Sequence, residues 1–513
     1  MSETSYNATT DFIDRHLNEG RGAKTAVIDD AGEYSYAEVA ARVNRGANLL
    51  TGLGLERENR VALIMHDTVD YLSAYFGAMK AGIIPICLNT LLTTKQYRYI
   101  LEDCRARVLF VSAAVLPAVQ PVLHELPALR HVVVCNGDAG EHKSFDALMA
   151  AASDKFEAVD THPDEIAFWL YSSGSTGMPK GTMHRQSSLR YTADTFGSQV
   201  IGLREDDVTF SAAKIFFAYG LGNALTFPLS VGATLVLMAE RPTPESVMKV
   251  LKRTNPSIYF GVPTLYAAML ANSNCTRENG SGRLRLCVSA GEALPEDVGN
   301  RWRERFGVDI IDGVGSTEML HIFLSNRPGE VRYGTSGKPV PGYTVRLVDE
   351  DGNDVPEGEI GELIVDGASA ASAYWNQREK SINTFAGRWT WTGDKYQRDA
   401  DGYYSICGRS DDMFKVSGIW VSPFEVEAAL ISHESVVEAA VVPHEDDEGL
   451  IKPKAYVIFK EGIELNDALF EALKAHVKGK AGAWKYPRWI EARAELPKTA
   501  TGKIQRFKLR EEA

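Results

Sequence analysis

The stretch Tyr171-Ser-Ser-Gly-Ser-Thr-Gly-Met-Pro-Lys-Gly181 follows directly on an apolar run, Ile166 to Leu170. It brings four serine or threonine hydroxyls, three glycines and one lysine into eleven residues. Hydroxyls and glycine amides donate hydrogen bonds, glycine allows close approach of the backbone, and lysine supplies positive charge. The stretch therefore predicts a loop after a strand that holds a polyphosphate. A flexible Gly/Ser linker is the alternative, but a linker has no reason to follow a strand closely or to end in Pro-Lys-Gly.

The spacing within this stretch separates it from two common nucleotide-binding motifs. A Walker A loop has G-x-x-x-x-G-K followed by Ser or Thr, whereas Lys180 follows Pro179 and precedes Gly181. No Gly-x-Gly-x-x-Gly fingerprint opens a helix nearby. The sequence therefore predicts a phosphate loop of neither kind.

Length and composition limit the class of protein. A chain of 513 residues is too long for one ordinary core and predicts at least two domains. With 44% apolar and 24% charged residues it is typical of a soluble globular protein. Its net charge of −13 argues against binding to nucleic acid or to an anionic membrane, so a local donor cluster must hold any anionic ligand.

Cysteine usage and the first residues indicate a reducing compartment. The six cysteines form no C-x-x-C pair and most lie in apolar surroundings, which favours buried thiols over disulfides or zinc ligands. Residues 1–15 contain no apolar core flanked by basic residues, and the longest apolar run, near Ile83–Leu88, is too short for a membrane span. We expect a cytoplasmic enzyme.

Along the first four hundred or so residues, apolar runs alternate with amphipathic stretches. Thr68–Lys80 has apolar residues at helical spacing, and Thr93-x-x-Gln96 is a capping box for a helix that reaches Asp103. The strands that this alternation predicts are Val61–Met65, Ile83–Leu88, Val108–Val111, Val208–Ala212, Thr234–Met238, Ser257–Phe260, Leu284–Ser289 and Asp309–Asp312. The rhythm predicts parallel sheets covered by helices.

Two further segments belong to this region. Pro295–Phe306 is expected to be a helix with proline at its first position, and the polar segment Asn272–Arg283 a surface loop. From about Tyr343 the pattern becomes rich in strands and turns, with Asp-Gly pairs at 351–352 and 401–402.

The pattern changes again at Arg409-Ser-Asp-Asp412. Beyond it, Ser422-Pro-Phe-Glu425 combines a capping box with proline at the first helical position. Two strands, Val436–Val442 and Lys454–Phe459, and a helix over Leu465–Val477 are expected to follow. We therefore predict an α/β chain with two domains. Residues 1–410 form a large domain of parallel-rich sheets flanked by helices, with a β-rich subdomain, and residues 411–513 form a small mobile α+β domain.

Several weaker motifs contain chemically suitable residues. In Asp312-Gly-Val-Gly-Ser-Thr-Glu318, after a strand end, the glutamate is a hard oxygen donor suited to Mg²⁺, although such a turn can also simply cap a helix. Thr392-Gly-Asp394 can be an ordinary turn, and Arg409 a surface ion-pair residue. Pro497-Lys-Thr-Ala-Thr-Gly-Lys503 can be a solvated basic tail.

Taken together and in this order, these motifs resemble the adenylate-forming superfamily of acyl-CoA ligases, luciferases and peptide-synthetase adenylation domains. The resemblance covers essentially the whole chain, and the joint match is highly specific. It implies ATP, Mg²⁺ and coenzyme A as cofactors and a carboxylic acid as substrate. The nucleotide-binding residues that it implies are Ser172, Ser173, Gly174, Ser175, Thr176, Gly177, Lys180, Ala290, Gly291, Glu292, Asp312, Gly313, Thr317, Asp394 and Arg409.

The resemblance also implies individual roles. Thr317 would contact the α-phosphate, Glu318 would hold Mg²⁺, Asp394 would accept both ribose hydroxyls, and Lys503 would be required for adenylation. The residues implied for the hinge and for coenzyme A are Asp411, Lys415, Ser417 and Gly418. One departure is Val314, which stands where many relatives have an aromatic residue that stacks on adenine.

The acid pocket is expected in Lys214-Ile-Phe-Phe-Ala-Tyr-Gly-Leu-Gly222 and Met319-Leu-His-Ile-Phe323. These segments are similar to those of the benzoate–CoA ligase branch, which implies benzoate or 4-hydroxybenzoate as substrate. The substrate-binding residues expected are Phe217, Ala218, Tyr219, Gly220, Gly315, His321 and Ile322. For Phe216 a core position is preferred, and His321 can be either an interior histidine or a pocket wall. His184 is expected to be structural.

Four alternatives stay open from the sequence. The acid could be cyclohexanecarboxylate or another acyl group, the acceptor could be a carrier protein, the reaction could be a light-emitting oxidation, or the chain could be a nucleotide-binding regulator without catalysis. Retention of Glu318, Asp394, Arg409 and Lys503 argues against the regulator. The assembly expected is a homodimer or a monomer, without nucleic acid or membrane.

Overall fold

A computed structural model describes residues 5–173, 178–410, 412–416, 419–447, 449–482, 484–498 and 504–512. The chain divides into two compact units, which are described separately. The large unit comprises Met1–Val345 and Val365–Trp391, and the small unit comprises Arg346–Ile364 and Thr392–Ala513. This division groups residues 392–410 with the C-terminal segment. The boundary predicted at Asp411 stays a prediction, and Asp411 itself lies outside the described residues.

One mixed sheet of the large unit contains the strands on either side of the predicted phosphate loop. Its order is β19-β9-β8-β4-β3-β5-β6-β7. Strands β8, β4, β3, β5, β6 and β7 are parallel, whereas β9 runs antiparallel to β8, and β19 antiparallel to β9. The bounds are β3 Arg60–Ile64, β4 Ile84–Cys87, β5 Val108–Ser112, β6 His131–Cys135, β7 Lys143–Ser144, β8 Ile166–Ser173, β9 Pro179–Arg185 and β19 Ala373–Tyr374.

A second mixed sheet of the same unit has the order β16-β15-β14-β13-β12-β10-β11-β1-β2. The strands from β14 to β1 in the middle of the sheet are parallel, whereas β15, β16 and β2 at its edges each pair antiparallel with their neighbours. The bounds are β1 Thr25–Ile28, β2 Glu33–Ser35, β10 Val208–Ser211, β11 Thr234–Val236, β12 Ile258–Gly261, β13 Leu286–Ser289, β14 Ile310–Gly315, β15 Ile322–Ser325 and β16 Lys338–Pro339.

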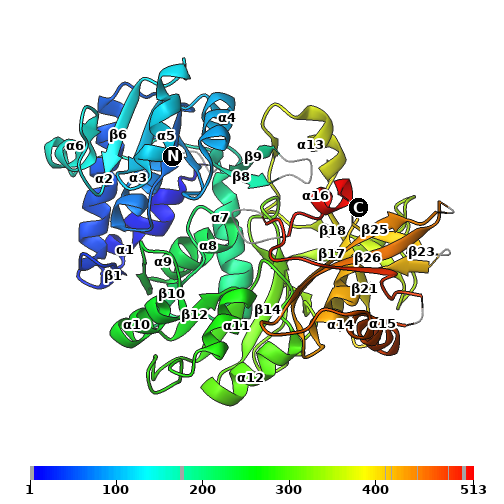
Figure 1. The fold of residues 1–513 in the computed structure, drawn as a ribbon. Helices are drawn as coiled ribbons and strands as arrows, with labels where there is room; N and C mark the ends of the chain where they lie inside the picture. Colours follow the sequence, from blue (N-terminus) through cyan, green and yellow to red (C-terminus); the bar gives the residue numbers. More distant parts are fainter. Residues whose placement is uncertain are drawn as a thin grey trace. The chain divides into compact units, whose positions relative to one another are not determined.

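Helices connect the parallel strands, as Figure 1 shows for α10 and α12 beside the second sheet. Helices α2 and α3 pack closely against each other. A Cβ on Gly46 would lie 2.5 Å from the Ser73 carbonyl oxygen, so only glycine allows this approach. The bounds are η1 Thr10–Asp14, α1 Arg15–Asn18, α2 Tyr36–Gly52, α3 Val69–Lys80, α4 Thr94–Cys104, α5 Leu116–Val119, η2 Gln120–Glu125, α6 Phe145–Ala151, α7 Gln186–Thr192, η3 Ala193–Val200, α8 Ala218–Leu221, η4 Gly222–Thr226, α9 Phe227–Val231, α10 Pro244–Thr254, α11 Pro263–Ala271, α12 Glu296–Phe306 and α13 Arg378–Thr384.

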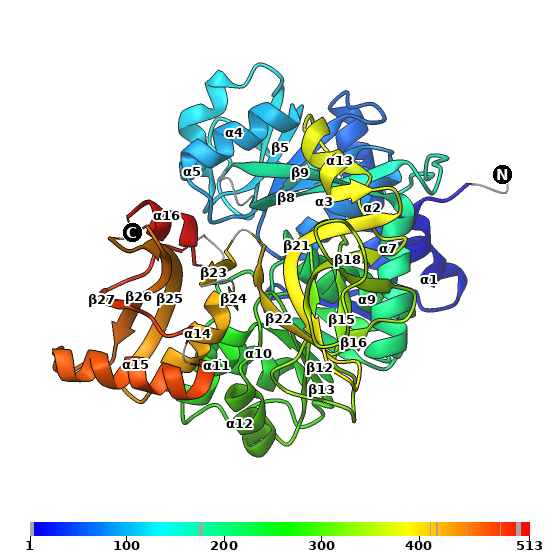
Figure 2. The same ribbon diagram turned by 90° about the vertical axis from the view of Figure 1, so that its right-hand side faces the viewer.

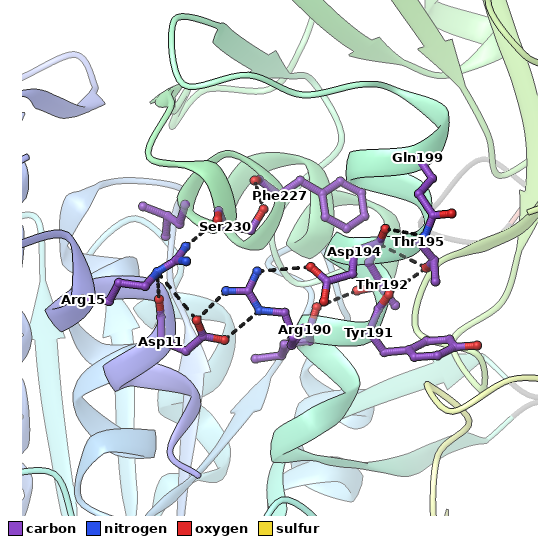
Figure 3. A network of polar contacts seen from close by, with 12 residues as sticks. Asp11, Arg15, Arg190, Tyr191, Thr192, Asp194, Thr195, Gln199, Phe227 and Ser230 are labelled. Atoms are coloured by element: carbon purple, nitrogen blue, oxygen red, sulfur yellow. Dashed lines mark hydrogen bonds and ion pairs between the residues drawn. The ribbon is translucent and has the colours of Figure 1, made fainter. Parts of the chain in front are cut away.

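A half-buried ion pair fixes the N-terminal segment to α7. The Arg190 guanidinium donates to both carboxylate oxygens of Asp11, and Tyr6 donates to the same carboxylate at 2.8 Å. Arg190 also pairs with Asp194 at 3.2 Å, one helical turn further on (Figure 3). The network therefore joins η1, α7 and η3 through polar contacts.

The strand- and turn-rich region forms a sheet of order β17-β18-β21-β20, and β22 pairs with β21. Both predicted Asp-Gly pairs are turns, in which Gly352 and Gly402 have positive φ values of 82° and 81°. The bounds are β17 Thr344–Val348, β18 Ile360–Asp366, β20 Phe385–Ala386, β21 Trp389–Arg398 and β22 Tyr404–Arg409.

The C-terminal part of the small unit is an α+β sandwich around the sheet β25-β26-β27. Figure 2 shows α15 running along one face of this sheet, where Leu473 and Val477 are buried against Val441 and Val457. On the other face Leu509 of α16 packs with a second apolar cluster. The bounds are β23 Phe414–Val416, β24 Ile419–Val421, α14 Pro423–Ile431, β25 Val436–Glu445, β26 Ile451–Phe459, α15 Asp467–Ala481, β27 Trp489–Ala492 and α16 Arg506–Glu511.

The fold class is confirmed, as is the capping box at Thr93, where Gln96 completes both halves. All six cysteines are buried free thiols, as expected. No described helix is long and apolar enough to cross a membrane.

Four local predictions were wrong. Tyr171–Ser173 and Pro179–Gly181 are strand rather than loop, because the segment forms an antiparallel pair. Gly313–Gly315 continues β14, since β15 returns beside it. Pro295 precedes the helix as its N-cap instead of occupying the first helical position. Ser422 accepts the Glu425 amide, but the Glu425 carboxylate pairs with Lys485 rather than closing a capping box.

Candidate active site

The predicted phosphate segment lies between two paired strands. Ser172 is paired with Lys180 across β8 and β9, which fixes the backbone of Lys180, and the residue is half-buried. Gly174, Ser175, Thr176 and Gly177 lie outside the described residues. The two strands therefore fix Lys180, the last charged residue of the predicted phosphate loop, near the start of β9.

Thr317 and Glu318 lie in the turn between β14 and β15. The Met319 amide donates to the Ser316 hydroxyl at 3.1 Å, and the Leu320 amide to the Thr317 carbonyl at 3.2 Å. Leu320 has a φ of 67°, which costs a bulky residue about 1–3 kcal/mol and is typical of functional sites. The turn is therefore sharply bent, and Thr317 and Glu318 within it are half-buried.

Lys180 and Glu318 lie together in the structure. The Lys180 Nζ is 3.7 Å from the Glu318 Oε1 and 4.1 Å from the centre of the Tyr374 ring. The Tyr374 hydroxyl donates to the same Glu318 oxygen at 2.7 Å. A cation and a carboxylate from separate elements thus lie side by side, as a site for a metal-bound polyphosphate requires.

The donor set fits Mg²⁺ that arrives with a nucleotide. Among the described residues no group of three or more His, Cys, Asp or Glu side chains could hold a metal ion. Mg²⁺ is typically held by one or two carboxylates together with substrate phosphates and water, rather than by an all-protein cage. Glu318, a half-buried carboxylate beside Lys180, meets that requirement.

The segment Ala290-Gly291-Glu292 follows β13, as expected. Gly291 is exposed with a φ of 97°, and Glu292 is half-buried. The Asp312 carboxylate lies beneath this segment and accepts the Leu294 amide at 3.3 Å. Burial raises the pKa of Asp312 to about 7. The Asp312 side chain therefore faces the interior and positions the segment, while Gly313 is buried in β14.

The acid-pocket segment is fixed at the carboxyl ends of the parallel strands. The Lys214 ammonium donates to the Met238 carbonyl and, at 2.8 Å, to the Glu240 carbonyl. The Asp67 carboxylate accepts the Ile215 amide at 3.3 Å. A Cβ on Gly220 would lie 1.9 Å from the Lys214 carbonyl oxygen, so this turn requires glycine.

The aromatic residues of this segment differ in exposure. Phe216 is buried in the core, as preferred, whereas Phe217, Ala218 and Tyr219 are half-buried. The Tyr219 hydroxyl lies 3.0 Å from the Val288 carbonyl oxygen and 3.1 Å from the Gly261 carbonyl oxygen, so that its single proton is shared between these two acceptors. Its ring is thus held by the ends of two neighbouring strands.

His321 is a neutral, buried ring beside Tyr219. Its Nε2 is 3.2 Å from both the Tyr219 carbonyl and the Asn223 Oδ1, and its Nδ1 has no hydrogen-bond partner among the described residues. Burial lowers the pKa of His321 to about 3. Neighbouring Ile322 is buried, and Gly315 leaves room for the His321 carbonyl, 2.5 Å from where a Cβ would lie.

His184 makes the corresponding contact on the phosphate side. Its Nε2 is 2.9 Å from the Thr317 carbonyl, and its ring stacks on Phe168 at 5.1 Å between centroids. Burial lowers the pKa of His184 to about 4. The structural role expected for His184 is therefore to support the turn that contains Glu318.

The small unit brings Asp394 and Arg409 together. They are opposite one another on β21 and β22, and the Arg409 Nη1 is 2.9 Å from the Asp394 Oδ1. The same guanidinium nitrogen donates to the Thr392 carbonyl at 3.2 Å. Exposed Lys415 lies on β23. Asp411, Ser417, Gly418 and Lys503 lie outside the described residues.

Residues 14–375 match the AMP-binding enzyme family, and residues 425–503 match the AMP-binding enzyme C-terminal domain. The chain belongs to the AMP-binding enzyme family. It is 59% identical over 98% of its length to the benzoate–CoA ligase of Thauera aromatica, of which it covers 96%. It is 54% identical over its whole length to the 4-hydroxybenzoate–CoA/benzoate–CoA ligase of Rhodopseudomonas palustris, of which it covers 95%.

Solved structures agree with these sequence relatives. The anthranilate CoA ligase AuaEII in complex with anthranoyl-AMP superimposes with a TM-score of 0.93 at 46% identity, over 99% of this chain and 98% of that one. A benzoate CoA ligase from Burkholderia xenovorans LB400 gives 0.90 at 48% identity, over 98% of this chain and 100% of that one. The AMP-binding enzyme fold therefore extends over the full chain.

Tyr374 is the site residue that sequence reasoning missed. It lies in a two-residue strand, Ala373–Tyr374, outside every motif identified from the sequence. A single tyrosine has no periodicity or spacing that would distinguish it from a core residue. Only the pairing of β19 with β9 brings it to Lys180.

Proposed function

We propose that this AMP-binding enzyme is an ATP-dependent aryl-CoA ligase of the benzoate or 4-hydroxybenzoate type. The acid and ATP would form an acyl-adenylate and pyrophosphate, and coenzyme A would then displace AMP to give the thioester. The observation that carries this proposal is the turn between β14 and β15. Two residues of this turn are three positions apart: Glu318, which is suited to a nucleotide-bound metal, and His321, which contacts Tyr219.

In the first step the acid carboxylate attacks the α-phosphorus. Two anions approach one another, and Lys180 with the Lys503 ammonium would offset the charge that develops. Mg²⁺, held by Glu318 and the phosphates, would supply further positive charge. Removing one such preorganised donor typically lowers the rate about a hundred- to a thousandfold.

The acid would bind against the segment that contains Phe217 and Tyr219, with Ala218 and Gly220 leaving room for a ring. This assignment agrees with the aryl substrates in the names of the relatives and with the anthranoyl-AMP bound in one solved structure. His321, which is neutral and lies beside Tyr219, would add no charge to this pocket. Ribose would be held by Asp394, with Arg409 supporting its carboxylate.

The second step requires a thiol to reach the acyl-adenylate. We assign Asp411 to a hinge, and Lys415, Ser417 and Gly418 to the coenzyme A side, by resemblance to the superfamily. Rotation at Asp411 would exchange Lys503 for the Gly418 face between the two steps.

Pyrophosphate exchange with a panel of acids tests the substrate. The panel contains benzoate, 4-hydroxybenzoate, 2-aminobenzoate, cyclohexanecarboxylate and butyrate. We expect exchange to require an acid and to be fastest with benzoate or 4-hydroxybenzoate. Equal rates with cyclohexanecarboxylate and benzoate would contradict the aromatic assignment, and no exchange with any acid would contradict adenylation.

Lys503→Ala tests the order of events. Adenylation should fall about a hundred- to a thousandfold, because one preorganised cation is lost. Conversion of supplied benzoyl-AMP to benzoyl-CoA should change little. An equal loss in both steps would contradict the two-step assignment of Lys503.

A further inference from the structure

Tyr374 is held in place by backbone contacts on both sides. Its strand β19 pairs with Thr182 of β9, and the next amide, that of Trp375, donates to the Gly181 carbonyl at 2.8 Å. The Tyr374 amide donates to the Ser381 hydroxyl at 3.0 Å. The side chain is 4% exposed, so both the ring plane and the hydroxyl direction are fixed.

The fixed ring contacts both charged groups of the proposed MgATP site, but in different ways. Its hydroxyl donates to the Glu318 Oε1 at 2.7 Å, while its face lies 4.1 Å from the Lys180 ammonium. The ammonium is 3.7 Å from that same carboxylate oxygen, which is within ion-pair range but beyond hydrogen-bond distance. The Glu318 Oε1 thus accepts a hydrogen bond from the Tyr374 hydroxyl rather than from the Lys180 ammonium.

Direct pairing of lysine with glutamate would oppose nucleotide binding. A hydrogen-bonded Lys180–Glu318 pair would neutralise the ammonium needed by the phosphates and occupy the carboxylate needed by their metal ion. A neutral phenol can satisfy the carboxylate without adding charge, and an aromatic face attracts an ammonium without a hydrogen bond.

We propose that Tyr374 is a positioning residue that takes the place of a direct hydrogen bond between Lys180 and Glu318 and orients the Glu318 carboxylate for the metal ion of MgATP. This inference rests on the proposed roles of those two residues in nucleotide binding. Tyr374 itself contacts neither the acid nor the reacting atoms in this assignment. Its effect should therefore pass through Glu318.

Calorimetric titration of MgATP into the full chain, without acid, tests the proposal without turnover. Tyr374→Phe should weaken MgATP binding about tenfold, the effect of losing one hydrogen bond to a charged group. Glu318→Gln should weaken it at least as much. The double variant should bind no more weakly than Glu318→Gln alone, because the phenol then has no charged carboxylate to position.

Controls distinguish this role from general damage. Tyr6→Phe removes another tyrosine–carboxylate hydrogen bond, 2.8 Å long and in the same unit, and should leave MgATP binding within about twofold of the parent. Circular dichroism checks folding of each variant. Tyr374→Leu, a second variant, removes both hydroxyl and ring and should lose at least as much affinity as Tyr374→Phe.

Three results would overturn the inference. Binding by Tyr374→Phe within about twofold of the parent would show that the hydroxyl has no such role. Losses that multiply in the double variant would indicate an effect independent of Glu318. If Glu318→Gln alone left MgATP binding unchanged, the proposed role of Glu318 would fail first, and this inference with it.

Discussion

The ion pair between Asp11 and Arg190 should contribute measurably to the stability of the large unit. Both carboxylate oxygens of Asp11 accept from the Arg190 guanidinium, and the side chains are only 17% and 24% exposed (Figure 3). Removing one partner leaves the other half-buried with only a weaker ion pair, Arg190 with Asp194 at 3.2 Å or Asp11 with Arg15 at 3.7 Å. Asp11→Asn and Arg190→Gln, alone and together, therefore give an informative double-mutant cycle.

The expected loss of folding free energy follows from how far the pair is buried. Breaking a fully buried ion pair by removing one partner costs about 3–5 kcal/mol, and partial exposure of this one reduces that to about 2 kcal/mol. The matched control is Asp297 with Arg301, a pair one turn apart on α12 whose side chains are 72% and 48% exposed. Exposed pairs of that kind contribute about 0.3–0.5 kcal/mol.

The assay is urea denaturation followed by circular dichroism at pH 7. We expect a coupling energy of about 1–2 kcal/mol for Asp11 with Arg190, and at most about 0.5 kcal/mol for Asp297 with Arg301. Equal coupling energies in the two cycles would refute the argument from burial.

The same pair predicts a pH dependence with a definite sign. Burial alone would raise the pKa of Asp11, but the hydrogen bonds and charge of Arg190 together hold that pKa below its ordinary value. A carboxyl with a lowered folded-state pKa adds stability above its unfolded pKa, about 4, and loses it as pH falls through the folded value. The stability difference between the parent and Asp11→Asn should therefore shrink below about pH 4.

Three further predictions concern the acid pocket. In steady-state kinetics, Lys214→Met should raise KM for the aromatic acid about tenfold, while KM for ATP stays within about twofold. The reason is that the Lys214 ammonium anchors only the segment expected to form the acid pocket. Lys214→Arg should recover part of the lost affinity for the acid. His321, with a pKa lowered to about 3 by burial, should cause no inflection in KM for the acid between pH 5 and 8, and an inflection that disappears in His321→Gln would contradict this. Gly220→Ala should lower kcat/KM at least about tenfold, because the new Cβ would lie 1.9 Å from the Lys214 carbonyl oxygen. The control is Gly52→Ala, where no atom lies within 4 Å of the new Cβ. It should leave activity unchanged and raise the free energy of unfolding by about 0.5–1 kcal/mol.

The elements that the sequence predicted well are those with a local signal. Helix α3 has its apolar periodicity, and α4 has a capping box whose two halves both form. Parallel strands buried on both faces are continuous apolar runs, so β5 and β13 were recognisable. In each case the residues that set the structure are neighbours in the sequence.

The antiparallel segments around the site had no such signal. Strand β9 contains Pro179, Lys180 and Gly181, and β14 continues through Gly313-Val-Gly315; both compositions are typical of loops. They become strands because distant partners supply the hydrogen bonds, β8 for one and β15 for the other. Tyr374 could not be found for the same reason, since its role depends on pairing across almost two hundred residues.

These tertiary contacts connect one short turn to both proposed binding sites. His184, on the strand that contains Lys180, contacts the Thr317 carbonyl on one side of Glu318. His321, on the other side, contacts the Tyr219 carbonyl of the acid-pocket segment. Burial keeps both rings neutral near pH 7, with pKa values lowered to about 4 and about 3, so neither contact changes charge over the working range. A displacement of His321 itself would therefore move the turn that contains Glu318. We expect that pocket substitutions which displace His321 will also weaken MgATP binding, whereas those confined to Phe217 will change acid selectivity alone.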